Sequence, residues 1–190
     1  MTTQQLIVGT VVYSVALATV VFFTGPAGRR FAGALAGAVV VDGLGLWALI
    51  PFGEVQGWWS VRLNPSPSYR ALFYLGTTVS TVPIFLVTWR IARRFGWRGL
   101  AVTFAVVAVG GPPREIAVAS KFPELVTVTP GIAMVLALSV GYVGAFAVGH
   151  GVMRLVAGPA KESRLARWPW EAAQSGAAPG QGRLQAFPGS

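Results

Sequence analysis

The chain has 190 residues, of which 54% are hydrophobic and only 11% are charged. A soluble domain usually carries about 25% charged residues, so this composition indicates an integral membrane protein. The sequence contains no cysteine, which excludes a disulfide framework, thiolate metal sites and thiol catalysis. Its net charge of +9 is spread over several loops and a tail, which favours charge-directed membrane orientation over nucleic-acid binding.

Five long apolar stretches define the expected architecture. They cover residues 6–23, 31–50, 71–89, 99–119 and 131–156. A helix needs about 20 apolar residues to cross the hydrocarbon core, because every backbone N–H and C=O must be bonded within the segment. We therefore predict an all-α, polytopic membrane protein in which residues 1–157 form a bundle of five transmembrane helices. Residues 158–190 are expected to form a basic, partly disordered cytoplasmic tail.

Basic residues between the stretches predict the orientation of the chain. The first loop, the third loop and the region from the end of the fifth stretch onward hold Arg29, Arg30, Arg90, Arg93, Arg94, Arg98, Arg154, Lys161, Arg164, Arg167 and Arg183. The second and fourth loops hold only Arg62, Arg70, Arg114 and Lys121. Cytoplasmic loops carry the excess of Lys and Arg, so we predict the N-terminus outside and the C-terminus in the cytoplasm. We expect the cytoplasmic membrane of a bacterium as the location.

The fourth apolar stretch contains an interruption. Gly110, Gly111, Pro112 and Pro113 follow each other there, and apolar character resumes at Ile116. Glycine permits positive φ and two prolines withhold two backbone donors, so we predict a helix broken or kinked between Gly110 and Pro113. One interpretation is a simple kink followed by an ordinary outer loop. The other is a break inside the membrane that serves a ligand, with residues 122–131 partly re-entrant, because such backbone is tolerated only beside protein or a watery cavity.

Asp42 is the most informative single residue, twelve residues into the second stretch. A carboxylate at this depth costs at least about 2.5 kcal/mol, so we expect it to face the bundle with a hydroxyl or Arg114 within hydrogen-bonding reach. The helical rise places further polar residues near the same depth. The candidate ligand or proton site is Asp42, Arg114, Glu115, Tyr13, Thr77, Thr81 and Tyr142. Its role is either a proton or cation relay, a polar ligand anchor, or a structural pair that fixes helix register.

Other residues predict packing rather than chemistry. Gly33 and Gly37 on the second stretch, and Gly141, Ala145 and Gly149 on the fifth, recur every four residues. Such spacing lets helix backbones approach closely, and we expect it to serve contacts within this bundle. The only histidine, at position 150, cannot build a multi-histidine metal site, and we expect an imidazole at the membrane interface with no special role and no metal.

The function classes follow from what the chain contains. It has one aspartate in the apolar stretches and neither a G-x-S-x-G nor an H-E-x-x-H motif. Our first hypothesis is a non-catalytic membrane protein that binds a protein partner or an apolar, lipid-like ligand within the bundle. The alternatives are a membrane-embedded enzyme acting on a lipid-like substrate near Asp42, Arg114 and Glu115, and a proton- or ion-coupled carrier that uses Asp42. The expected partners are the lipid bilayer and that ligand or protein, without nucleic acid, and the sequence identifies no cofactor.

Overall fold

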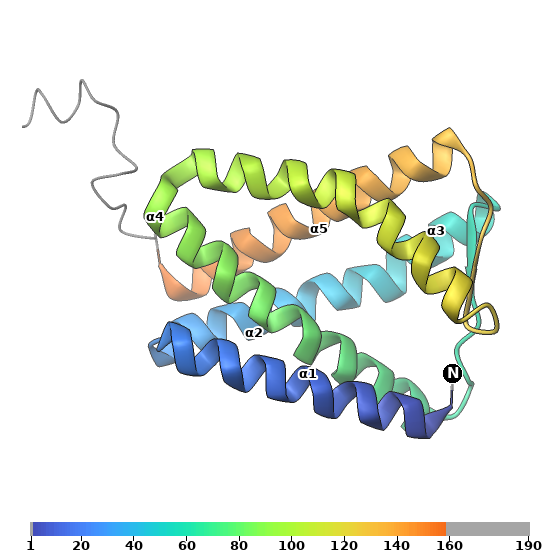
Figure 1. Cartoon of the computed structure of the whole chain (residues 1–190), viewed down its shortest axis with the longest axis horizontal. Helices are drawn as coiled ribbons and strands as arrows, with labels where there is room; N and C mark the ends of the chain where they lie inside the picture. The colour runs from blue at the N-terminus through green and yellow to red at the C-terminus, as the bar shows by residue number, and fades with distance from the viewer. Residues whose placement is uncertain (1, 159–190) are drawn as a thin grey trace, which may run out of the picture.

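The computed structural model describes residues 2–158, and most of the predicted tail lies outside this range. Four helical segments are long and apolar enough to cross a membrane: α1 (Thr3–Thr24), Gly28–Val55, α4 (Pro67–Lys121) and α5 (Ile132–Ala157). The second segment is continuous but composite, with α2 at Gly28–Leu44, the π-helix η1 at Gly45–Leu49 and α3 at Ile50–Val55. The long helices lie alongside one another, as Figure 1 shows, and the all-α fold is confirmed.

The outer surface of these helices is apolar. In α1 only Leu6 is buried, while Val15 is 62% and Phe22 is 81% exposed. A soluble protein rarely leaves so large an apolar surface uncovered. Four side-chain hydroxyls of α1, those of Thr10, Ser14, Thr19 and Thr24, each donate a hydrogen bond to the carbonyl four residues earlier, so these four need no other partner. This surface suits contact with a lipid bilayer.

The helix α4 turns back on itself at Gly96. A straight helix of 55 residues would be roughly 80 Å long, far more than the hydrocarbon core of about 30 Å. At Gly96 the backbone adopts φ 61° and ψ −150°, a conformation that essentially only glycine tolerates. Figure 1 shows the resulting bend, which divides α4 into a first arm, 67–95, and a second arm, 97–121. The bend falls between the third and fourth apolar stretches of the sequence.

The helix continues through Gly110–Pro113, so the predicted break is wrong, whereas the kink that we gave as the other possibility agrees with the bend of the second arm in Figure 1. The only non-helical backbone inside α4 is at Gly96, and the second arm bends without interruption along its course (Figure 1). Pro112 has no N–H for the carbonyl of Ala108, but the hydroxyl of Ser139 on α5 donates to that carbonyl at 2.8 Å. A neighbouring helix thus supplies the missing donor, which is how membrane helices tolerate internal proline.

A small sheet covers one end of the bundle. Strand β1 (Trp59–Val61) pairs antiparallel with β2 (Val126–Val128), and Trp59 lies opposite Val128. These strands were not predicted, and β2 occupies part of the stretch that we expected to be re-entrant. The ring of Trp59 packs onto Gly53 in α3, where a Cβ atom would lie 1.7 Å from the indole. The indole is therefore held against α3.

Small residues join α2 to α5 as predicted. A Cβ atom on Gly37 would lie 2.6 Å from the carbonyl oxygen of Gly149, and one on Gly33 would lie 3.0 Å from that of Met153. Gly149 in turn faces the ring of Phe85 on the first arm of α4. The buried core around these contacts is Ala34, Ala38, Val82, Phe85, Leu86, Trp89 and Met153. All of it lies in the half of the bundle that includes the α1–α2 turn and Gly96.

Candidate functional site

The other half of the bundle contains a cavity of about 330 Å³ between α2, η1, α4 and α5, next to the two strands. Most of its walls are apolar, and the larger apolar side chains are Val41, Leu46, Leu49, Ile50, Trp59, Val61, Phe73, Val126, Val128 and Leu138. Its polar lining consists of Asp42, Thr77, Glu115 and Tyr142. The cavity therefore combines an apolar volume with a small set of hydrogen-bonding groups, as ligand sites usually do.

The π-helix η1 shapes one wall of this cavity. The N–H of Ile50 bonds to the carbonyl of Gly45, five residues earlier, which inserts one extra residue into the turn. Gly45, Leu46 and Leu49 all line the cavity. Single π-helical turns of this kind occur frequently at functional sites. The sequence analysis missed η1, although Gly45 and Pro51 mark the ends of the irregular segment.

Asp42 faces the cavity with one oxygen bonded and one unbonded. The hydroxyl of Thr81 lies 3.3 Å from Oδ1, so the expected hydroxyl is within reach, but its one proton is shared with the carbonyl of Thr77 at 2.9 Å. The second oxygen, Oδ2, is buried and has no hydrogen-bond partner among residues 2–158. The buried hydroxyl of Thr78 also has no hydrogen bond within 3.5 Å in that part of the chain, but it lies beside the Asp42 carboxyl and interacts with it. Oδ2 of Asp42 can therefore accept a hydrogen bond either from Thr78 or from a group in the cavity.

Glu115 and Tyr142 form a second polar group in the cavity wall. The Tyr142 hydroxyl donates to Oε1 of Glu115. Nη1 of Arg114 donates to the same carboxylate oxygen at 2.5 Å and to the Tyr142 hydroxyl at 2.9 Å. The ring of Tyr142 fits closely against Gly111, where a Cβ atom would lie 2.4 Å from it. Gly111 is therefore needed for close packing of Tyr142 rather than for a helix break.

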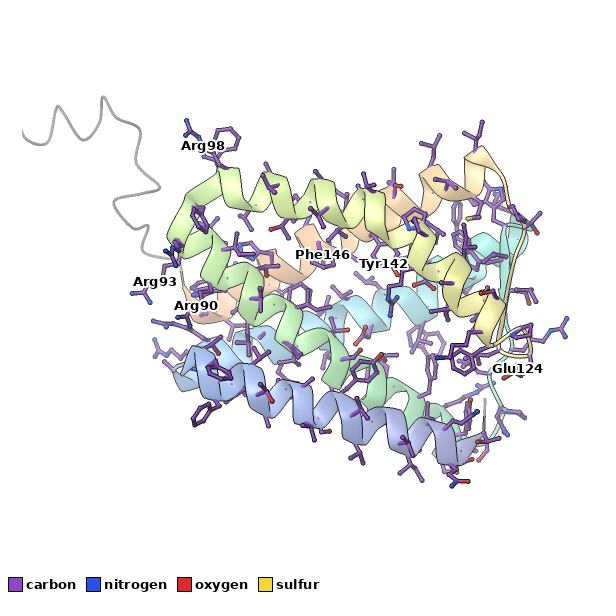
Figure 2. The ribbon with its side chains drawn as sticks, in the orientation of Figure 1. Arg90, Arg93, Arg98, Glu124, Tyr142 and Phe146 are labelled. Carbon is purple, nitrogen blue, oxygen red and sulfur yellow. The ribbon has the colours of Figure 1, made fainter. Side chains whose placement is uncertain are left out.

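The structure brings most of the predicted site residues together. Four of them line the cavity directly: Asp42, Thr77, Glu115 and Tyr142. Thr81 and Arg114 do not line it, but each is hydrogen-bonded to a residue that does. Figure 2 shows Tyr142 and Phe146 between the helices, well away from Arg90 and Arg93 at the end of the bundle. Tyr13 is the exception, because it lies on α1, is 46% exposed and does not line the cavity.

His150 is buried between the helices. Its side chain is only 6% exposed, and its ring packs 6.2 Å from the ring of Trp89, so it is enclosed by protein rather than open to solvent. The residues on either side of it, Gly149 and Gly151, have no side chains. Within residues 2–158, no group of three or more histidine or acidic side chains is placed to hold a metal ion.

The chemistry of the cavity is that of a site for an amphiphilic molecule. Apolar walls can accommodate a hydrocarbon body, and the carboxylates can accept hydrogen bonds from a polar end. Comparison with protein-family models, with curated proteins and with solved structures finds no match for this chain.

Proposed function

We propose that the chain is a five-crossing protein of a bacterial cytoplasmic membrane that binds an apolar, lipid-like ligand inside its helix bundle. The bend at Gly96 supports five crossings rather than four. The two arms of α4 would be roughly 44 Å and 38 Å long, and each exceeds the hydrocarbon core of about 30 Å. The ligand occupies the cavity between α2, α4 and α5, and the protein binds this ligand without catalysing a reaction.

The charge distribution supports the orientation with the N-terminus outside. One end of the described bundle carries Arg29, Arg30, Arg90, Arg93, Arg94, Arg98 and Arg154. The described acidic residues, Asp42, Glu54, Glu115 and Glu124, all lie elsewhere along the helices or at the end with the strands. An excess of arginine at one end is the pattern of a cytoplasmic face.

The observation that carries the ligand proposal is the mainly apolar cavity with the Asp42 carboxyl in its wall, where Oδ2 makes no hydrogen bond within 3.5 Å to residues 2–158 and Thr78 is the neighbouring donor. A carboxylate oxygen accepts hydrogen bonds and cannot donate one. The ligand therefore presents a hydroxyl or ammonium group to Asp42 and an apolar body to residues such as Phe73 and Leu138. A volume of about 330 Å³ lies at the lower end of the size range of small-molecule sites, roughly 300–1,000 Å³.

Native mass spectrometry of the gently purified protein tests this proposal. The wild type should retain a small amphiphilic molecule, and Ala145→Phe should lose it, because the added ring fills the cavity that Ala145 lines. Ala147→Phe is the matched control, since Ala147 lies two residues away on α5 and is exposed. Equal retention by both variants, or no retained molecule in the wild type, would contradict the proposal.

One observation favours a second candidate, a membrane-embedded enzyme acting on a lipid-like substrate. Two carboxyl groups, of Asp42 and Glu115, and the phenol of Tyr142 line the same cavity. Acid–base catalysis needs such groups beside the substrate, to donate and to accept a proton. Incubation of the reconstituted protein with a bacterial lipid extract should then yield a product that both Asp42→Asn and Glu115→Gln abolish. Absence of any product with the wild type would leave binding as the function.

A further inference from the structure

A second cavity, of about 500 Å³, lies at the end of the bundle opposite the strands. It opens between the α1–α2 turn, residues 24–26, and the first arm of α4. Four arginines line it, Arg30 from α2 and Arg90, Arg93 and Arg94 from α4, together with Trp89. Figure 2 shows Arg90 and Arg93 at this end, far from Glu124 at the other. We refer to this cavity as the arginine pocket.

The fold builds the arginine pocket from two directions. Gly25 has a φ of 48°, which ends α1 in the left-handed conformation and turns the chain into α2. Arg30 thereby reaches the side of the first arm. Positions 90, 93 and 94 are three and four residues apart and share one face of a helix. Nη1 of Arg90 also donates to the carbonyl of Phe23 at 3.3 Å, which ties this arm to the end of α1.

The charged side chains that are described in the lining of the arginine pocket are all positive. Among residues 2–158, none of those that line it is acidic. Like charges held in one cavity repel each other, and a bound anion removes this repulsion. The planar guanidinium group matches the geometry of phosphate oxygens with two parallel N–H donors, whereas chloride and other spherical ions offer no such match.

We infer that the arginine pocket binds a phosphate group. Its place at the end of the apolar helices, on the side that the charge distribution assigns to the cytoplasm, puts it at the depth of lipid headgroups. Basic pockets between membrane helices on the cytoplasmic side bind anionic headgroups by this chemistry. A soluble phosphate presents the same oxygens, so the experiment must separate the two sources.

Thermal unfolding of the full chain in nanodiscs provides the test. A ligand that binds the folded state raises Tm with its concentration. The phosphate of phosphatidylcholine is neutralised by its own choline ammonium, whereas that of phosphatidylglycerol leaves the headgroup with a net negative charge. We therefore expect phosphatidylglycerol in the discs to raise the Tm of the wild type above its value in phosphatidylcholine alone, and Arg93→Gln and Arg30→Gln to lose most of this increase. Arg29→Gln should keep it, because Arg29 has the same charge at the same end but does not line the pocket.

The two phosphate sources give different results. If the ligand is a headgroup, inorganic phosphate added to phosphatidylcholine discs leaves Tm unchanged; if it is a soluble anion, that addition alone raises Tm in the wild type and not in Arg93→Gln. Unchanged Tm values of the variants in phosphatidylcholine show that they fold. Neither source stabilising the wild type, or Arg29→Gln losing as much as Arg93→Gln, would overturn the inference.

Discussion

A carboxyl group inside a membrane bundle is stable only if the protein or a ligand supplies its hydrogen bonds. The hydroxyls of Thr81 and Thr78 lie beside the Asp42 carboxyl, and its second oxygen makes no hydrogen bond within 3.5 Å to residues 2–158. The sequence predicted this residue and its hydroxyl partner, because a lone aspartate in an apolar stretch has few alternatives. It did not predict that Oδ2 would remain unbonded, since that depends on which side chains of α4 and α5 reach the same space.

Replacement of Asp42 by asparagine tests its role as a ligand anchor. The Asp42→Asn side chain keeps an oxygen that can accept from Thr81, so the free energy of unfolding should change by less than about 1 kcal/mol. Loss of the charge-assisted bond should weaken ligand retention about tenfold. Titration of the identified ligand against both proteins measures this. Unchanged affinity in Asp42→Asn would show that the carboxylate has only a structural role.

Ser139 should matter for stability through a single bond. Ser139→Ala removes the donor to the carbonyl of Ala108, and Pro112 has no N–H to replace it. The free energy of unfolding should therefore fall by about 1 kcal/mol. Ser14→Ala is the control, because its hydroxyl donates to the carbonyl of Thr10 on an exposed face of α1. Equal denaturation midpoints of the two variants in detergent would show that the carbonyl of Ala108 needs no partner.

At the scale of the helices, apolar length was the reliable signal. The first, second and fifth stretches correspond to α1, to α2 with its extension, and to α5, because hydrocarbon surroundings require continuous apolar helices. Glycine and proline were poorer guides. Gly110 and Gly111 lie within a regular helix, whereas the real turn is at Gly96, which the arginines around it predicted only as a loop. The strands escaped prediction because their six residues pair across more than 60 positions of sequence.

The bend in α4 gives a matched pair of glycine variants. Gly96→Ala places a Cβ on a backbone with φ 61° and ψ −150°, which should cost about 1–3 kcal/mol of stability. Gly110→Ala should be neutral or stabilising by up to about 1 kcal/mol, because Gly110 is helical and has open space at its Cβ position. Chemical denaturation of the reconstituted proteins compares the two. If the denaturation midpoint of Gly96→Ala equals that of the wild type, the chain does not adopt this turn.

Across the described bundle, the closely packed core and the cavity beside Asp42 lie in different halves. The small residues of α2 and α5 bring the helices together near the α1–α2 turn, around Phe85 and Met153. Toward the strands, the cavity beside Asp42 takes the place of a packed core. Such a division gives the proposed ligand site a closely packed support at one end of the bundle.

The crossing number can be tested with single cysteines, because the natural chain has none. In intact cells, a membrane-impermeant maleimide should label Ser68→Cys and Thr129→Cys, which lie at the end with the strands. Ala27→Cys and Trp97→Cys should react only after the membrane is permeabilised. Labelling of Trp97→Cys in intact cells, with Ser68→Cys also labelled, would mean that the first arm of α4 does not cross the membrane.

The central claim is that the cavity beside Asp42 holds a ligand, and an experimental structure of the protein in native lipid nanodiscs tests it most directly. We predict non-protein density in the cavity, with a polar end within about 3 Å of Oδ2 of Asp42 and an apolar body along Phe73 and Leu138. A cavity closed by its own side chains, or filled by residues 159–190 of the chain, would contradict the claim.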